Sequence, residues 1–175
     1  MEPVELSTGE YHLRQFRADD GLDDRPALIE AFADENHQRF VLNYPLRTLE
    51  DATVYMARRA SEWARGERCS WAVAAGDNEQ LLGEVGLKDL DLCAGTAEVT
   101  LWVHPFERRR GIAVTALGAA LRFGTSTLGL REISYLYHAD NVASAAVARR
   151  CGFRFIDTLL SSDGRKLLRC RRVTE

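Results

Sequence analysis

The most regular alternation of apolar and polar side chains lies in Glu98–Val103. Here Val99, Leu101 and Val103 face one way and the intervening residues face the other, which predicts a β-strand. After a short loop at His104–Arg110, the spacing changes to that of a helix over Gly111–Leu128. Its apolar stripe is formed by Val114, Leu117, Leu121 and Leu128.

The same reading along the rest of the chain predicts a mixed α/β order. Strands are expected at Glu10–Arg17, Ser70–Ala75, Leu81–Leu87 and Glu132–His138, with a final hairpin of Phe153–Ser161 and Arg165–Val173. Helices are expected at Asp20–Asn36, Thr48–Arg65 and Asn141–Cys151, with Thr48 as a cap and Gly152 as the C′ glycine. Hairpins combined with helical crossovers imply a mixed sheet flanked by helices.

Composition adds the class of protein. The 175 residues fit one domain over residues 1–175, and 28% charged with 46% hydrophobic residues is ordinary for a soluble globular chain. There is no apolar stretch of about 18 residues and no apolar signal segment near Met1, so we expect a cytoplasmic protein without a membrane partner. Nothing in the sequence fixes the oligomeric state, and a homo-oligomer is compatible with it.

Cysteine and histidine spacing narrows the chemistry. The four cysteines form no CxxC pair, and we expect them reduced. The four histidines have no metal-ligand spacing, so no metal is expected.

Charge is unevenly distributed. Residues 1–107 hold 21 acidic and 10 basic residues, a balance of −11, whereas residues 108–175 hold 5 and 13, a balance of +8; together they give the net charge of −3. Two solvated faces explain this pattern, but it also fits two ligands of opposite charge. On the second interpretation, a cationic acceptor docks against the N-terminal half, where Asp19, Asp20, Asp23, Asp24, Asp34 and Glu35 cluster.

The segment that carries most chemical information is Val99–Ala113. A strand leads into a basic, glycine-containing turn, and a helix starts there. Free backbone N–H groups and the helix dipole make such a helix start an anion site, and Gly111 lets a phosphate approach the backbone. Charge and forked donors come from Arg108, Arg109 and Arg110. An arginine-rich helix cap is the alternative; a P-loop and a dinucleotide fingerprint are excluded by their missing residues.

Two motifs together resemble a known family. Val103-x-Pro105 with Arg108-x-x-Gly111-x-Ala113 resembles the acyl-CoA signature of the GNAT superfamily of N-acetyltransferases. Asn141-x-x-Ser144 and Cys151-Gly152-Phe153 resemble a block of its Rim-type branch, which acetylates the N-termini of ribosomal proteins. The resemblance implies a splayed mixed sheet in a single α/β domain, with acetyl-CoA as co-substrate. Ala113 in place of the commoner glycine is tolerated in the family, whereas Val114-Thr115-Ala116 departs from its usual Glu-Ala pair.

The resemblance also implies residue roles. The cofactor-binding residues would be Leu101, Trp102, Val103, Arg108, Arg109, Arg110, Gly111, Ile112, Ala113 and Asn141. The backbone of Leu101–Val103 would bind pantetheine and polarise the thioester carbonyl. Ser144 would protonate the leaving thiolate and Glu98 would be the general base, with Glu84 or a water chain as alternatives. The purely structural alternative is that Asn141 is an N-cap and Ser144 a residue of the first helical turn.

These roles predict acetyl transfer to a primary amine by direct attack. An acyl-enzyme is not proposed, because no cysteine lies in the proposed site with a base beside it. The acceptor would be a protein N-terminus or a small amine such as an aminoglycoside, and no nucleic-acid partner is expected. The alternatives are a longer acyl-CoA in the same fold and a non-catalytic acyl-CoA-binding module.

Overall fold

A computed structural model describes residues 1–41 and 46–173. The strands are β1 (Leu6–Ser7), β2 (Tyr11–Arg14), β3 (Ala18–Asp19), β4 (Leu22–Asp23), β5 (Arg68–Ala75), β6 (Leu81–Asp91), β7 (Thr96–Val103), β8 (Glu132–His138), β9 (Arg154–Leu160) and β10 (Lys166–Val173). The helices are α1 (Arg25–Ala33), α2 (Glu35–Phe40), α3 (Leu49–Ala64), α4 (Ile112–Ser126) and α5 (Val142–Arg150), with a 3₁₀ turn at Pro105–Glu107.

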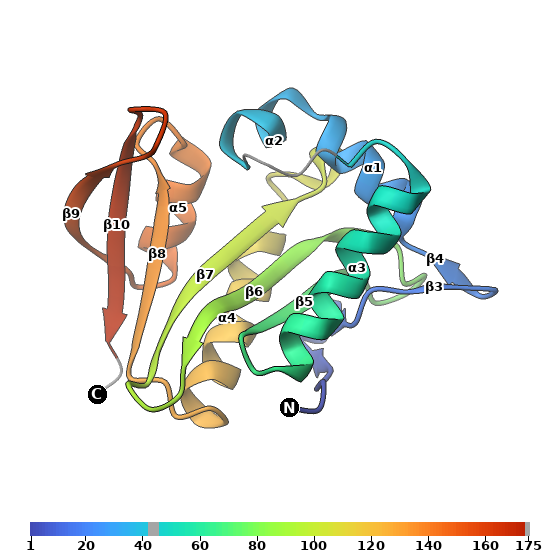
Figure 1. The fold of residues 1–175 in the computed structure, drawn as a ribbon, viewed down its shortest axis with the longest axis horizontal. Coiled ribbons are helices and arrows are strands. Elements are labelled where there is room, and N and C mark those ends of the chain that lie inside the picture. Colours follow the sequence, from blue (N-terminus) through green and yellow to red (C-terminus); the bar gives the residue numbers. More distant parts are fainter. Residues whose placement is uncertain (42–45, 174–175) are drawn as a thin grey trace.

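The main sheet is mixed, as the sequence predicts. Its strand order is β1-β2-β5-β6-β7-β8-β10-β9, and every neighbouring pair is antiparallel except β7 and β8. That parallel pair is joined only at Thr96–Glu132, Ala97–Ile133 and Glu98–Ser134. Beyond these three pairs the two strands diverge (Figure 1), which confirms the expected splay. The sheet is thereby divided into a β7 arm, formed by β1, β2, β5, β6 and β7, and a β8 arm, formed by β8, β10 and β9.

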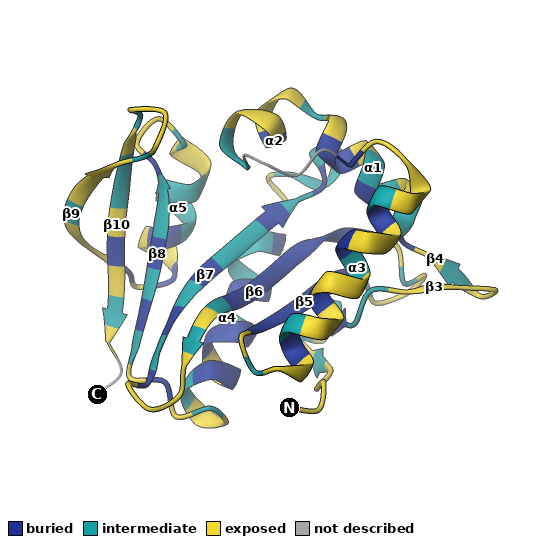
Figure 2. Cartoon of the chain, viewed as in Figure 1, coloured by how far each residue is buried: buried dark blue, intermediate teal, exposed yellow. Residues whose placement is uncertain are grey.

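Helices cover both faces of the β7 arm. Helix α3 lies across one face and α4 lies behind the opposite face (Figure 1). The α4 face packs the larger apolar core, which includes Val85, Leu87, Leu117 and Leu121. A second cluster joins α1 and α3 to Trp102 of β7. Figure 2 shows the outcome: β5 and β6 are buried over most of their length, whereas β9 is largely exposed.

The predicted helix at Asp20–Asn36 is wrong at both ends. Residues 18–23 form the β3–β4 hairpin instead, because Asp19 Oδ1 accepts hydrogen bonds from the N–H groups of Gly21 and Leu22 at 2.9 and 3.1 Å. Pro26 then fits the first turn of α1, where a missing N–H costs nothing. Asp34 is extended, with ψ of 133°, and its side chain caps a separate helix, α2.

Most other predicted elements are confirmed with shifted ends. Strand β8 has the predicted bounds, while β2 is shorter than Glu10–Arg17, and β6 and β7 extend beyond their predicted ranges at the turn that joins them. Thr48 caps α3 in a capping box with Asp51, and Gly152 adopts φ of +79° after α5.

Candidate active site

A cleft of about 730 Å³ opens where the two arms separate. Its walls come from segments far apart in the sequence: α2, the end of β7, the start of α4, Tyr135 of β8 and the start of α5. Among the predicted cofactor-binding residues, those that line it are Leu101, Trp102, Val103, Arg108, Arg109, Gly111, Ile112, Ala113 and Asn141. The predicted acid Ser144 lines it as well, so one cavity gathers most of the predicted site.

The turn before α4 has the geometry of an anion site. Gly111 adopts φ of +82° at the N-cap of α4, and Arg109 adopts φ of +65° two residues earlier. Such left-handed backbone favours glycine, and a Cβ built on Gly111 meets no atom within 4 Å. Within the described residues, none of the N–H groups of residues 109–113 donates a hydrogen bond. Free donors therefore converge beside the cleft at the positive end of a 15-residue helix.

The three arginines of this turn have different surroundings. Arg108 forms an ion pair with Asp34, and Arg110 forms one with Glu107 and does not line the cleft. Arg109 is exposed, lines the cleft, and has no ion pair with any described residue. Arg109 and the backbone N–H groups of residues 109–113 are thus the more direct donors for an anion. Arg108 would have to bind the anion while paired with Asp34.

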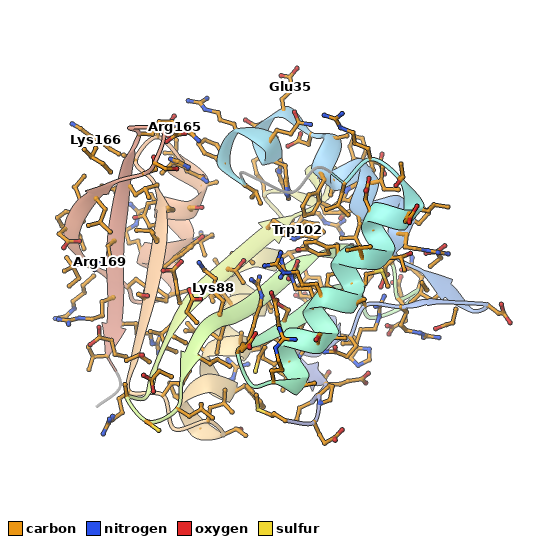
Figure 3. All side chains as sticks on the ribbon, viewed as in Figure 1. Glu35, Lys88, Trp102, Arg165, Lys166 and Arg169 are labelled. Carbon is orange, nitrogen blue, oxygen red and sulfur yellow. The ribbon has the colours of Figure 1, made fainter. Side chains whose placement is uncertain are left out.

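The end of β7 supplies backbone and little side-chain chemistry. Leu101 and Val103 pack against the α4-face core, while Trp102 points to the opposite face. There its indole Nε1–H donates to Glu84 Oε2 at 2.9 Å (Trp102 is labelled in Figure 3). Because no residue after Glu98 pairs with β8, the β8-facing backbone of this segment is open to the cleft.

The start of α5 combines a structural and a chemical arrangement. Asn141 Oδ1 accepts a hydrogen bond from the Ser144 N–H at 3.0 Å, which is the predicted N-cap. The Ser144 hydroxyl is left for other partners. Burial raises the pKa of Tyr135 to about 12, and a hydrogen bond with the Ser144 side chain opposes that rise. Tyr135 is both a wall of the cleft and a neighbour of Ser144.

The two candidate carboxylates both lie outside the residues that line the cleft. Glu98 Oε1 lies 2.7 Å from Lys88 Nζ, on the strand pair just before the splay. Glu84 is fully buried, and its Oε2 accepts hydrogen bonds from the Tyr55 hydroxyl and the Trp102 indole. Its Oε1 lies 3.3 Å from Arg59 Nε. Glu84 is therefore the centre of a buried polar network, with two hydrogen-bond donors on Oε2 and the guanidinium groups of Arg59 and Arg68 beside Oε1.

His37 is a cleft residue that the sequence reasoning missed. It lies on α2, is 4% exposed, and its ring packs against Phe32 and Trp102 with centroids 4.1 and 5.6 Å away. The buried Nε2 has no hydrogen-bond partner among the described residues. Burial, followed by the Arg108 charge, lowers the pKa of His37 to about 4, although Asp34 and Glu84 act in the opposite direction.

Helix α2 reaches from one arm to the other at the mouth of the cleft. On the β7 side, the Asp34 carboxylate that caps α2 is paired with Arg108. On the β8 side, Arg39 pairs with Asp140, and Arg165 Nη1 donates to the Arg39 carbonyl at 2.8 Å. Figure 3 shows Arg165 at the tip of the β9–β10 hairpin, on the side that faces α2.

The acidic cluster of the N-terminal half is mostly neutralised. Asp19, Asp23 and Asp24 pair with Arg17, Arg25 and Arg14, respectively, and Asp34 pairs with Arg108. These contacts explain four of the six carboxylates without a cationic substrate. The charge pattern therefore gives no independent evidence about the acceptor.

The described residues contain neither a metal-binding cluster nor a membrane-spanning helix. No group of three or more His, Cys, Asp or Glu side chains there is arranged to hold a metal ion. No helix within residues 1–41 and 46–173 has the length and apolar character needed to cross a membrane.

Comparisons with known proteins agree with this geometry. Residues 11–154 match the family model described as an acetyltransferase (GNAT) domain. The chain is 25% identical over 154 residues to YoaA, an uncharacterized N-acetyltransferase of Bacillus subtilis, covering 88% of this chain and 84% of the relative.

Solved structures share the fold at low identity. RimL, a ribosomal alpha-N-protein acetyltransferase bound to coenzyme A, aligns with a TM-score of 0.82 at 18% identity, over 97% of this chain and 98% of that one. Spermidine N-acetyltransferase from Vibrio cholerae, bound to CoA and spermine, aligns with a TM-score of 0.76 at 16% identity, over 94% and 95% of the two chains. The matched family model spans most of the chain, which therefore belongs to the GNAT acetyltransferases and is an acyl-CoA-dependent acetyltransferase.

Proposed function

We propose that this enzyme transfers the acetyl group of acetyl-CoA directly to a primary amine within a ternary complex. The observation that carries the proposal is that one cleft joins the free N–H groups before α4, the open backbone of β7 and the Ser144 hydroxyl. Phosphate, pantetheine and leaving thiol each have a matching group along this cleft.

The donor would bind along the β7 arm. Its pyrophosphate accepts hydrogen bonds from the backbone of residues 109–113 and from Arg109, which are charge-assisted contacts worth roughly 1.5–3 kcal/mol each. Its pantetheine amides pair with the β8-facing backbone that β7 leaves open after Glu98. Asn141, at the cleft wall, is a second polar contact for that arm.

The transfer itself needs an oxyanion donor and a proton for the leaving group. A backbone N–H of Leu101–Val103 stabilises the charge that develops on the thioester oxygen. As the carbon–sulfur bond breaks, Ser144 donates its proton to the CoA thiolate. No cysteine lines the cleft among the described residues, which supports direct attack over an acyl-enzyme.

Glu98 stays a prediction as the base for the amine. With Lys88 on its Oε1 and no contact with the cleft, it would have to act through water. Glu98→Gln tests this role, because a base that acts at this position gives an acidic limb of the pH–rate profile that the variant loses.

The acceptor that we favour is a protein N-terminus, with small polyamines as the second candidate. The support is the pair of structural neighbours named above, one of which acts on a ribosomal protein and the other on spermidine. Longer acyl-CoA donors and a non-catalytic binding role are the remaining alternatives.

The test is thiol release from acetyl-CoA, measured with peptides that carry a free N-terminus, the same peptides with a blocked N-terminus, and spermidine. We expect release only with free amines, and mass spectrometry should find one added acetyl group on the acceptor. Tight acetyl-CoA binding without release for any amine would support the binding module instead. A preference for octanoyl-CoA over acetyl-CoA would identify a longer acyl-CoA as the donor.

A further inference from the structure

His37 is the buried polar residue in the cleft that the proposed chemistry leaves unused. Its Nε2 is sealed from water and has no hydrogen-bond partner among the described residues, while its ring lies between Phe32 and Trp102. A phenylalanine would pack in this aromatic site without leaving a buried polar atom unsatisfied. An imidazole here is explained if a ligand that enters the cleft hydrogen-bonds to it.

The position of His37 is suited to the acceptor. Trp102, which it contacts, belongs to the β7 segment whose backbone would hold the thioester. Ser144 lines the other side of the same cleft, on the β8 arm. An amine that attacks between the two arms would therefore meet His37 on the β7 side while the thiol leaves toward Ser144.

The groups that face His37 leave it neutral at neutral pH. Its pKa is lowered to about 4, chiefly by burial and next by the Arg108 charge, although the carboxylates of Asp34 and Glu84 oppose these two effects. A neutral imidazole has a lone pair that can take a proton. Phosphates bound near Arg108 would offset part of its charge and make His37 more basic when the donor is present.

The geometry points to His37 as the general base that takes the proton from the attacking amine, a role that rests on the proposed acetyl transfer. The acceptor ammonium first loses one proton to water. The amine nitrogen then bonds to the thioester carbon, and the nitrogen gives its second proton to His37. The carbon–sulfur bond breaks and the thiolate takes the Ser144 proton. The proton held by His37 then passes through water to Ser144 and restores its hydroxyl. Because the acceptor ammonium lost its first proton to water, each turnover releases one proton.

The matched test is His37→Phe, which keeps an aromatic ring against Phe32 and Trp102. With acetyl-CoA and an N-terminally free peptide, we expect kcat to fall about 10²–10⁴-fold and the acidic limb of the pH–rate profile to disappear. Calorimetric binding of acetyl-CoA should stay within about threefold, which shows that the cleft is intact. His12→Phe, at a half-buried histidine on β2, is the control and should keep both activity and limb.

A second variant makes the test independent of how well His37→Phe folds. Added imidazole should restore part of the kcat of His37→Ala, because the small base enters the vacated space. An unchanged kcat and limb in His37→Phe, or no rescue of His37→Ala, overturns the assignment. If the acidic limb of the pH–rate profile is lost in Glu98→Gln but kept in His37→Phe, Glu98 is the general base and the assignment to His37 is wrong. Wild-type enzyme that acetylates no amine overturns the proposed function itself.

Discussion

The two arms of the sheet differ in how they are built and in what they contribute. The β7 arm is packed on both faces by α1, α3 and α4, and its strands β5 and β6 are buried. The β8 arm ends in β9, where Phe155 and Leu160 are 60% and 72% exposed. The β7 arm supplies the anion turn, open backbone and His37; the β8 arm supplies Tyr135, Asn141 and Ser144. The proposed phosphate-binding turn and the open backbone thus lie on the more buried arm, while Asn141 and the proposed acid lie on the other.

The largest expected effect comes from the anion turn of the β7 arm. Gly111→Glu should abolish acetyl-CoA binding, because it puts a carboxylate against the phosphates and strains a backbone with φ of +82°. Calorimetry measures the loss. Gly129→Glu is the matched control, since Gly129 also has positive φ and open space but does not line the cleft. If Gly111→Glu bound acetyl-CoA normally, the assignment of the phosphate site to this turn would be wrong.

A change on the β8 arm should affect turnover and spare binding. Ser144→Ala should lower kcat by up to about 10²–10⁴-fold with little change in the KM for acetyl-CoA, because general acid assistance acts in the transition state. Easy departure of a thiolate makes the lower end of that range more realistic. Ser126→Ala, at the exposed end of α4, is the control for loss of a helical hydroxyl. An unchanged kcat in steady-state kinetics would reduce Ser144 to a helix residue.

The packing difference between the arms predicts unequal stability effects. Leu87→Ala removes a fully buried side chain of β6 and should cost about 2–5 kcal/mol of unfolding free energy. Leu160→Ala on β9 should change it by less than about 0.5 kcal/mol, because that side chain is mostly in water. Denaturant titrations of the two variants give the comparison directly. Equal losses would mean that β9 is covered in solution, for example by a second copy.

The smallest effect is expected where α2 touches the β8 arm. Partial burial raises the pKa of Asp140, but the hydrogen bond from Arg39, a backbone hydrogen bond and the charges of Arg39 and His138 together outweigh burial, and the pKa lies below its ordinary value. A lowered carboxylate pKa means that the pair is present above the ordinary value and is lost as pH falls through the lowered one. Asp140→Asn should hardly change Tm, because exposed pairs contribute little. It should raise deuterium uptake in α2; unchanged uptake would mean that other contacts hold this helix.

The sequence predicted the elements that carry their own periodic signal. Strand β8 and helix α4 follow from side-chain spacing. The β3–β4 hairpin and α2 are too short for such a signal. They depend on Asp19 and Asp34, whose side chains bond to the backbone in ways that a helical pattern also tolerates.

His37 was missed for a related reason. Its neighbours on α2 are mostly polar, so the local pattern indicates an exposed helix. The fold instead packs Phe32 and Trp102 against the His37 ring. A sequence signal was present in Asp34, an N-cap type of residue three positions earlier, which marks where a new helix starts. Recognising that cap would have placed His37 in the first turn of its own helix.

The early separation of β7 from β8 also affects association with other proteins. Unpaired strand edges are templates for intermolecular pairing, and most lie on the outside of a sheet, as β9 does here. The edge that β7 presents after Glu98 lies inside the molecule, between its own two arms and beneath α2. Because this edge is enclosed by the two arms, it is shielded from pairing with the edge strand of another folded molecule.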